Sequence, residues 1–394
     1  MKVREVAIHS RLRPQRLSGR ETPHLTIESN TTCNIRCACC YCIEEAAAVK
    51  PLAQVLDEID LAVEKRNLDA ISLLGGEPTL HPDIVRIVKY VKQKGLVCLL
   101  LTNGVRFLQG DAGLLDALVA AGVDRFLVHI DEGQKHVHGD IDAARHRLFD
   151  MLDARRVAYG LSLTLYPGAE GALPAILRQH ARHQGFDGVL CTLAFDVDHA
   201  FDDGEHGRAS MARAYEGISK GLGIEPAAYL PSSTDDEEVC WLMYFYWINA
   251  DTGAAFELSP ETSRAMKAVY RATHGHHFFA ETMDPKWRRV SLVASAAAEL
   301  ARQPRRAKAL LSLLEAARGG EALRFHYLVV QQAPRFDSEH GKVQICWQCP
   351  DATIRNGKLT PVCIADRVNP LGERPGTAPA QVVRDVLGHL GETP

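Results

Sequence analysis

Five cysteines fall within ten residues of this 394-residue chain, in the run Cys33-Asn-Ile-Arg-Cys37-Ala-Cys39-Cys40-Tyr41-Cys42. Cys33, Cys37 and Cys40 have the spacing C-x3-C-x2-C. Three thiolates on one short loop can bind three irons of a cubane [4Fe–4S] cluster and leave the fourth iron open to an outside ligand. A zinc site or a disulfide knot is the alternative, although zinc sites more often pair a C-x2–4-C motif with a second, distant pair.

A strand is expected directly before these cysteines, over residues 24–30. The cysteines would then lie at the C-terminal end of that strand, where barrel enzymes have their active sites. A second motif, Gly75-Gly76-Glu77-Pro78, follows the next expected strand, residues 70–74. Glycines let a backbone approach a ligand closely and adopt angles closed to other residues. The alternative for this motif is an ordinary turn before a helix that begins near residue 81.

The C-x3-C-x2-C motif, an aromatic residue directly after it and the Gly-Gly-Glu-Pro turn about 35 residues later together resemble the radical SAM superfamily. The resemblance implies that Cys33, Cys37 and Cys40 hold a [4Fe–4S] cluster and that S-adenosylmethionine (SAM) chelates its open iron. Reductive cleavage of SAM would give a 5′-deoxyadenosyl radical that abstracts hydrogen from a substrate. A flavodoxin- or ferredoxin-type protein would supply the electron.

The resemblance also implies which other residues hold SAM. They are Tyr41, the aromatic residue beside the cluster, and Gly75, Gly76 and Glu77, which would hold the SAM amino group. Cys39 and Cys42 have no role in this scheme.

Apolar runs alternate with amphipathic segments from residue 24 to about 196. Strands are expected at 24–30, 70–74, 97–102, 125–131, 159–166 and 188–195, and helices at 51–66, 82–94, 112–121, 141–156 and 173–184. Such β/α units predict a parallel sheet with helices outside. Six units are too few for a complete eight-stranded barrel and match the open six-unit barrel of the superfamily.

Two further polar residues follow strands of this expected barrel. Asn103 follows the third strand and could hydrogen-bond the ribose or carboxylate of SAM; a plain turn is the alternative. Asp131 ends the fourth strand and is a candidate SAM or substrate residue. His129 points to the same side of that strand as Asp131, and we interpret it as a core histidine.

A second cysteine motif lies near the C-terminus, where Cys346, Cys349 and Cys363 are spaced C-x2-C-x13-C. It resembles the auxiliary-cluster (twitch or SPASM-like) regions of radical SAM enzymes and implies a second [4Fe–4S] cluster. Its fourth ligand could be Cys240, a residue such as Asp366, or none. Structural zinc remains an alternative. The spacing also matches that of the molybdenum-cofactor GTP cyclase, whose C-terminal Gly-Gly is absent here.

Charge and hydropathy exclude several classes of function. With 45 basic and 49 acidic residues the net charge is −4, which gives no electrostatic footprint for nucleic acid. The N-terminus has no apolar signal sequence, and the longest apolar run, residues 239–248, is far shorter than the roughly 20 residues of a membrane span. We expect a cytoplasmic protein, in whose reducing surroundings clustered thiols indicate metal sites.

The expected fold class is α/β, a partial (β/α)6 TIM-type barrel followed by a mostly helical, cysteine-containing C-terminal region. The expected parts are a lead-in (1–22), the barrel (23–196), a connector (197–240), a mostly helical region (241–340) and the auxiliary-cluster region with the tail (341–394). Because the lead-in is short, we expect no N-terminal cobalamin-binding or peptide-recognition domain.

The preferred substrate is a small metabolite or lipid-like molecule, because the aromatic run from Trp241 to Trp247 could form an apolar wall over the site; a buried strand is the simpler interpretation. The alternative substrate is a ribosomal peptide or a protein side chain. A non-catalytic iron–sulfur or zinc protein is a different class, against which the acidic Gly-Gly-Glu-Pro turn argues.

Overall fold

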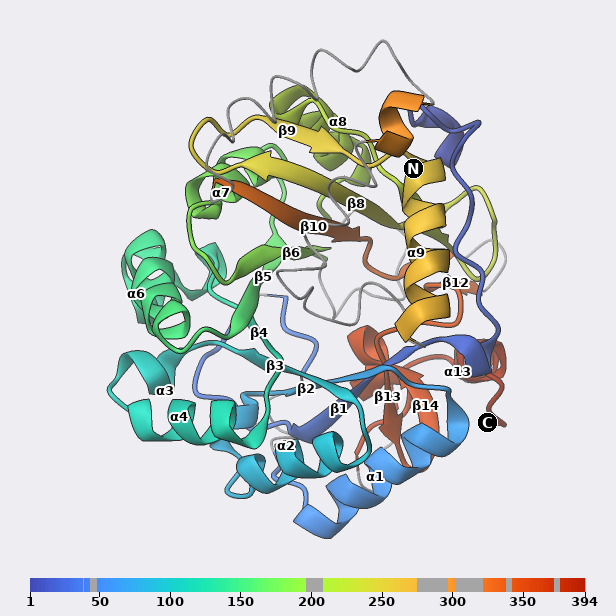
Figure 1. The fold of residues 1–394 in the computed structure, drawn as a ribbon. Coiled ribbons are helices and arrows are strands. Elements are labelled where there is room, and N and C mark those ends of the chain that lie inside the picture. The colour runs from blue at the N-terminus through green and yellow to red at the C-terminus, as the bar shows by residue number, and fades with distance from the viewer. Residues whose placement is uncertain are drawn as a thin grey trace.

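The computed structural model describes residues 1–37, 39–42, 48–195, 208–274, 297–301, 322–337, 342–371 and 376–393. Its main feature is a ten-stranded sheet in the order β1-β2-β3-β4-β5-β6-β10-β8-β7, with β9 paired to β8. The strands curve from β1 through β6 to β8 around the interior of the molecule (Figure 1).

The first six strands run parallel to one another, each beside its predecessor. They are β1 (His24–Asn30), β2 (Ala70–Gly75), β3 (Val97–Thr102), β4 (Arg125–Val128), β5 (Ala158–Leu165) and β6 (Phe186–Leu193). All six lie where the sequence predicts strands, and the partial (β/α)6 barrel is confirmed.

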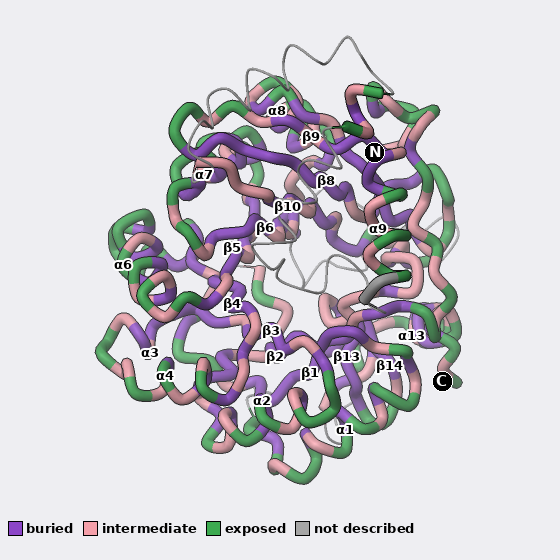
Figure 2. Tube along the Cα trace, in the orientation of Figure 1, coloured by how far each residue is buried: buried purple, intermediate pink, exposed green. Residues whose placement is uncertain are grey.

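Helices between these strands cover the outer face of the sheet and alternate buried with exposed residues (Figure 2). They are α1 (Leu52–Lys65), α2 (Ile84–Gln93), α3 (Val105–Leu108), α4 (Ala112–Ala121), α5 (Lys135–His138), α6 (Ile141–Ala154) and α7 (Leu173–His180). Local chemistry sets their ends: Asp140 Oδ1 accepts a hydrogen bond from the Ala143 amide at 3.0 Å, capping α6, and Gly122 (φ 102°) ends α4 in the left-handed region. Short 3-10 turns span Val3–Glu5, Gly19–Glu21, Pro78–Leu80, Glu132–Gln134 and Val362–Ile364.

Strands from the middle of the chain extend the sheet beyond β6. They are β7 (Ala228–Pro231), β8 (Val239–Asn249), β9 (Ala255–Glu257) and β10 (Leu323–Gln331), accompanied by α8 (Met211–Leu222) and α9 (Pro260–His274). β10 pairs parallel to β6 and antiparallel to β8. The aromatic run is thus a strand, buried throughout except at half-buried Trp241.

This extension differs from the mostly helical character expected for residues 241–340. Aromatic and β-branched residues suit a buried strand, and a short apolar run alone does not separate strand from helix. Most of the Ala- and Leu-rich segment at 292–316, in which a helix was expected, lies outside the described residues.

The C-terminal part bridges the two edges of the open barrel. It contains β11 (Arg335–Asp337), β12 (Lys342–Gln344), β13 (Ala352–Arg355), β14 (Lys358–Pro361), α12 (Ala365–Val368) and α13 (Ala380–His389). On one edge β13 lies beside β1 (Figure 1), where the Thr26 hydroxyl donates to the Ala352 carbonyl at 3.0 Å. On the other edge Cys346 forms a β-bridge with Ser232, directly after β7. Within the described part of the chain, no helix has the length and apolar character needed to cross a membrane.

Candidate functional site

A cavity of about 450 Å³ lies inside the curved sheet, and both cysteine motifs line it. Cys33, Cys37 and Cys40 contribute from the loop after β1, and the C-terminal cysteines Cys346, Cys349 and Cys363 contribute from the segment that bridges the sheet edges. The sequence predicts two separate sites; the structure brings them to one space.

Polar side chains approach the sulfurs of the first motif. Gln134 Nε2 donates to Cys37 Sγ at 3.4 Å, and Asn103 Nδ2 lies 3.7 Å from Cys33 Sγ. Burial raises the pKa of Cys37 to about 12, although the hydrogen bond from Gln134 opposes this shift. A hydrogen bond from the Cys42 thiol lowers the pKa of Cys40 to about 6. These donors would stabilise thiolates, the form that binds iron, so the residues present fit an iron–sulfur cluster.

Sequence reasoning missed Gln134 and assigned no role to Cys42. Gln134 is a buried side chain in the turn after β4, and only the fold brings that turn against the cysteine loop. Cys39 also lines the cavity, with its backbone in the left-handed region at φ 61°.

The two glycines of the Gly-Gly-Glu-Pro turn allow two chain segments to touch. A Cβ on Gly75 (φ 133°) would lie 1.9 Å from the Asn30 carbonyl oxygen, and one on Gly76 would lie 2.1 Å from that of Thr32. The Gly76 amide donates to the Asn30 carbonyl at 2.8 Å. Gly75 and Gly76 therefore hold the turn directly against the start of the cysteine loop.

The Glu77 carboxylate is buried where β2 and β3 end. Its Oε1 accepts from the hydroxyls of Thr79 at 2.6 Å and Thr102 at 2.9 Å, and its Oε2 accepts from the Asn103 amide at 2.7 Å. Burial raises the pKa of Glu77, although these hydrogen bonds pull it down. Glu77 thus joins the ends of two strands at the cavity wall.

Asn103 and Tyr41 connect the strand ends to the cysteine loop. The Asn103 side chain donates to Asn34 Oδ1 at 2.7 Å, and the Tyr41 hydroxyl donates to the Gly75 carbonyl at 3.3 Å. Both residues line the cavity.

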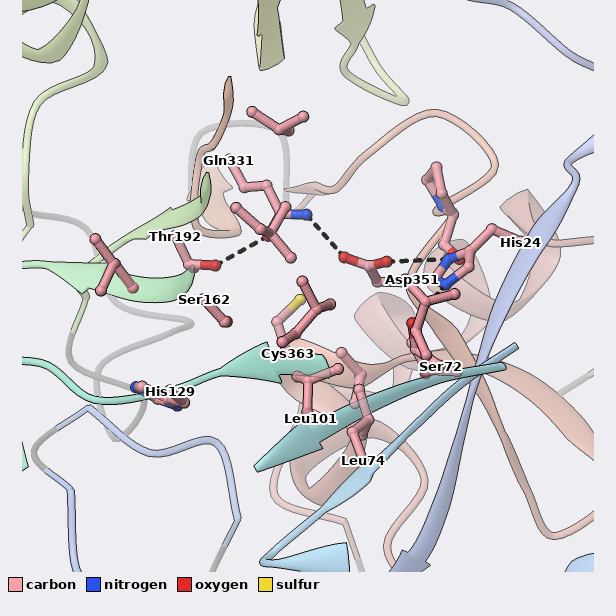
Figure 3. A pocket seen from close by; sticks show the side chains of 18 of the residues that line it. His24, Ser72, Leu74, Leu101, His129, Ser162, Thr192, Gln331, Asp351 and Cys363 are labelled. Carbon is pink, nitrogen blue, oxygen red and sulfur yellow. Dashed lines mark hydrogen bonds and ion pairs between the residues drawn. The ribbon is translucent and has the colours of Figure 1, made fainter. Parts of the chain in front are cut away.

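His129 lines the cavity, and Asp131 lies behind it. Asp131 Oδ2 accepts from His129 Nε2 and from the Thr164 amide, each at 2.9 Å, and its Oδ1 accepts from the Gly133 amide at 2.9 Å. Burial alone would lower the pKa of His129, but the hydrogen bond to Asp131 raises it. His129, which the sequence suggests is a core residue, has 31% of its side chain exposed and faces the cavity (Figure 3).

Cys240 lies against the second cysteine motif. The hydrogen bond between its thiol and that of Cys346 raises the pKa of Cys346. A second hydrogen bond, with Cys349, opposes this rise. Trp241 Nε1 donates to Cys346 Sγ at 3.1 Å. Cys240 itself comes from β8, so the structure brings together four cysteines from two distant segments.

The carboxylate of Asp366, the other residue considered as a fourth ligand, accepts a hydrogen bond from the buried guanidinium of Arg355.

Sequence reasoning also missed Arg66, directly after α1. Its guanidinium is buried and donates to the carbonyls of Gln348 at 2.9 Å and Cys349 at 3.1 Å. Burial lowers the pKa of Arg66 to about 10, and the cation fixes the second cysteine loop to the barrel.

A row of polar side chains crosses the cavity wall (Figure 3). The Thr192 hydroxyl donates to Gln331 Oε1 at 2.9 Å, Gln331 Nε2 donates to Asp351 Oδ2 at 2.8 Å, and Asp351 Oδ1 lies 3.3 Å from His24 Nδ1. Most of the remaining wall is apolar, with Trp241, Phe245 and Phe325 among its residues.

Comparison with known proteins identifies the matched part of the chain. Residues 27–162 match the radical SAM superfamily. Molybdenum cofactor biosynthesis protein 1 of Bos taurus is 34% identical over 121 residues, which are 29% of this chain and 18% of that protein. GTP 3′,8-cyclase of Streptomyces coelicolor is 32% identical over 155 residues, 37% of this chain and 43% of that one. The chain thus spans less than half the length of these relatives.

Among solved structures, Streptococcus suis SuiB bound to S-adenosylmethionine is 14% identical, with a TM-score of 0.37, over 43% of this chain and 40% of that chain. This likeness is too distant to support conclusions. The match to residues 27–162 begins within β1 and covers the cysteine loop, the Gly-Gly-Glu-Pro turn, β2 to β4 and part of β5. Residues 27–162 of this chain are therefore a radical SAM domain.

Proposed function

We propose that this protein is an enzyme that cleaves SAM reductively at a [4Fe–4S] cluster held by Cys33, Cys37 and Cys40. The 5′-deoxyadenosyl radical so formed would abstract hydrogen from a substrate bound in the cavity. One observation carries the proposal: the three cysteines and the Gly-Gly-Glu-Pro turn line one cavity at the C-terminal ends of parallel strands.

The chain's own residues would bind, orient and shield the reacting groups. Gly75, Gly76, Glu77 and Asn103 are proposed to hold SAM, with Tyr41 beside the cluster. Gln134 would donate to the cluster thiolate of Cys37. Asp131 would act through His129, because its carboxylate orients the imidazole that faces the cavity.

The second site is proposed to hold an auxiliary [4Fe–4S] cluster on Cys346, Cys349, Cys363 and Cys240. Four cysteine ligands would leave no iron open, which favours electron relay over direct substrate ligation. Trp241 Nε1 would then donate to a cluster sulfur, and such hydrogen bonds tune the reduction potential.

Metal analysis tests the second site. Anaerobically reconstituted protein should hold about eight irons with matching sulfide, and Cys240→Ser should lose about four of them. Cys98→Ser is the matched control, because Cys98 is equally buried but lies in β3 outside both motifs. About four irons plus about one zinc bound through sulfur would instead indicate a structural zinc site at the C-terminal cysteines.

The preferred substrate is a small molecule with an apolar part and a hydrogen-bonding group. The aromatic wall would contact the apolar part, and the row from Thr192 to Asp351 would bind the polar group. The matched GTP 3′,8-cyclases are named for a nucleotide, which also favours a small molecule. A ribosomal peptide is the alternative substrate, and a precursor peptide whose mass changes on incubation with the enzyme would favour it.

A flavodoxin- or ferredoxin-type protein is the proposed reductant.

SAM binding separates the enzyme from a non-catalytic iron–sulfur or zinc protein. Calorimetry on anaerobic, reconstituted protein should show one SAM site with a Kd in the micromolar range, about −8 kcal/mol. Protein without iron should bind SAM much more weakly, because the open iron supplies part of the site. Absence of SAM binding to the reconstituted protein would favour the non-catalytic iron–sulfur or zinc protein.

A further inference from the structure

Three histidines meet on the outer side of the barrel, on elements apart from the cavity. His146 lies on α6, His180 ends α7, and His183 is in the turn before β6. One ring nitrogen from each lies within 4.8 Å of the other two. None of the three lines the cavity between the cysteine motifs.

The hydrogen bonds of His183 direct the lone pair of its Nε2 atom toward the other histidines of the group. His183 Nδ1 lies 3.2 Å from Asp153 Oδ2. Because a carboxylate accepts, Nδ1 carries the proton and Nε2 keeps a free lone pair. His183 Nε2 is 2.8 Å from His146 Nδ1, so His146 Nδ1–H must be the donor between them. A carboxylate behind a histidine in this way is the usual support of a metal-binding imidazole.

His180 supplies an independent observation. It is fully buried, and neither of its ring nitrogens has a hydrogen-bond partner among the described residues. Its ring packs against Phe149 and Phe186, at centroid distances of 5.1 and 5.9 Å. An unpaired polar group in such surroundings costs about 1–3 kcal/mol, a cost that phenylalanine at this position would avoid. Burial also disfavours the charged imidazole, so a neutral ring with an available lone pair remains.

We propose that His146, His180 and His183 bind one divalent transition-metal ion, and that Zn²⁺ is the ion that fits them best. Neutral imidazole is a preferred zinc ligand at about 2.0–2.1 Å, which places two tetrahedral ligand nitrogens about 3.3 Å apart. His146 and His183 would separate by about half an ångström, and the His146 proton would move through solvent from Nδ1 to Nε2, so that Nδ1 of the still neutral ring can bind the metal. Water from the half-exposed side would complete the tetrahedron.

The bound ion would join α6, α7 and the start of β6. These elements belong to the second half of the barrel, where β6 also pairs with β10. Asp153 is a positioning residue in this site, because it touches His183 and none of the other ligands. It also accepts from the Tyr159 hydroxyl at 2.9 Å and the Gly185 amide at 2.7 Å, which fixes the carboxylate behind the imidazole.

Zinc titration of the reconstituted protein tests this site. We expect one Zn²⁺ per chain beyond the iron, and a zinc K-edge absorption spectrum with nitrogen and oxygen ligands only. His180→Phe keeps the aromatic packing and removes a ligand, and His146→Gln changes a half-buried residue; each should weaken binding by about 100-fold or more. Asp153→Asn should weaken it by about 10–100-fold with the same spectrum. The control is His9→Gln, at an exposed histidine that is not part of the group, which should leave affinity unchanged.

The outcomes separate this site from the cysteine sites. Nitrogen-ligated zinc that is lost in His180→Phe and His146→Gln supports the proposal. The proposal is overturned if wild-type protein retains no zinc at about 10 μM free ion, if its zinc has sulfur ligands alone, or if both folded variants bind zinc as wild type does.

Discussion

Replacing Cys33, Cys37 and Cys40 together by alanine should abolish the formation of 5′-deoxyadenosine from SAM. Each thiolate holds one iron of the proposed cluster, and without all three no open iron remains to bind SAM or deliver an electron. Reconstituted wild-type protein, incubated anaerobically with dithionite and SAM, should release 5′-deoxyadenosine and methionine. The triple variant should release neither above the background of SAM alone, and its iron content should fall by about four per chain.

A matched control distinguishes loss of the cluster from loss of the fold. Cys98→Ala changes a fully buried thiol of β3 that lines neither cysteine site, so it should keep the iron and the product. The triple variant should also keep the iron at the second site, because Cys346, Cys349 and Cys363 lie on a separate segment. Continued 5′-deoxyadenosine formation by a triple variant that contains no iron at the first site would contradict the assignment.

Local sequence patterns predict the barrel and the two cysteine motifs. Each expected β/α unit depends on a short run of apolar residues and a periodic helix, and both signals lie within about 20 residues of one another. Motif spacing is equally local, so C-x3-C-x2-C and C-x2-C-x13-C can be read directly. Side-chain alternation along the strand expected at 125–131 also places His129 and Asp131 on one side, and their 2.9 Å hydrogen bond agrees with this, although β4 itself ends at Val128.

The meeting of the two cysteine sites could not be predicted, because it depends on pairing between distant segments. β10 pairs with β6 across more than 130 residues, as in Val330 opposite Cys191. No periodic signal identifies the partner of a strand. The segment with Cys346, Cys349 and Cys363 reaches the cavity beside the first motif because this pairing extends the sheet and because β13 contacts β1.

Buried charges were the other feature hidden from sequence reasoning. Arg66 and Arg355 are fully buried, yet charged residues are almost never fully buried unless paired. In the sequence they look like ordinary surface residues. Only the fold shows that Arg66 binds the carbonyls of the second cysteine loop and that Glu28, on β1, faces an arginine from β13.

Changing Arg355 to methionine should destabilise the protein by about 3–5 kcal/mol, because it leaves two buried carboxylates without their cation. Arg355 Nε and Nη2 donate to the two oxygens of Glu28 at 2.6 and 2.7 Å, and Nη1 donates to Asp366. All three side chains are excluded from solvent. This group joins β1 to the β13–β14 hairpin, next to the segment with Cys349 and Cys363.

Guanidinium unfolding under anaerobic conditions measures the effect. Arg384→Met is the control: Arg384 is exposed on α13 and bonds only to Gln381 in the described part of the chain, so its loss should change the unfolding free energy by no more than about 0.5 kcal/mol. Replacing Glu28, Arg355 and Asp366 together by Leu, Met and Leu should restore much of the stability, because a complete buried charge group can be exchanged for apolar residues at little net cost. If Arg355→Met were as mild as the control, the charge group would not be what holds the hairpin on β1.

If Arg355→Met is as destabilising as expected, the second cysteine site should lose its iron at a lower guanidinium concentration than in wild type. The reason is that Cys349 and Cys363 flank the hairpin that Arg355 anchors.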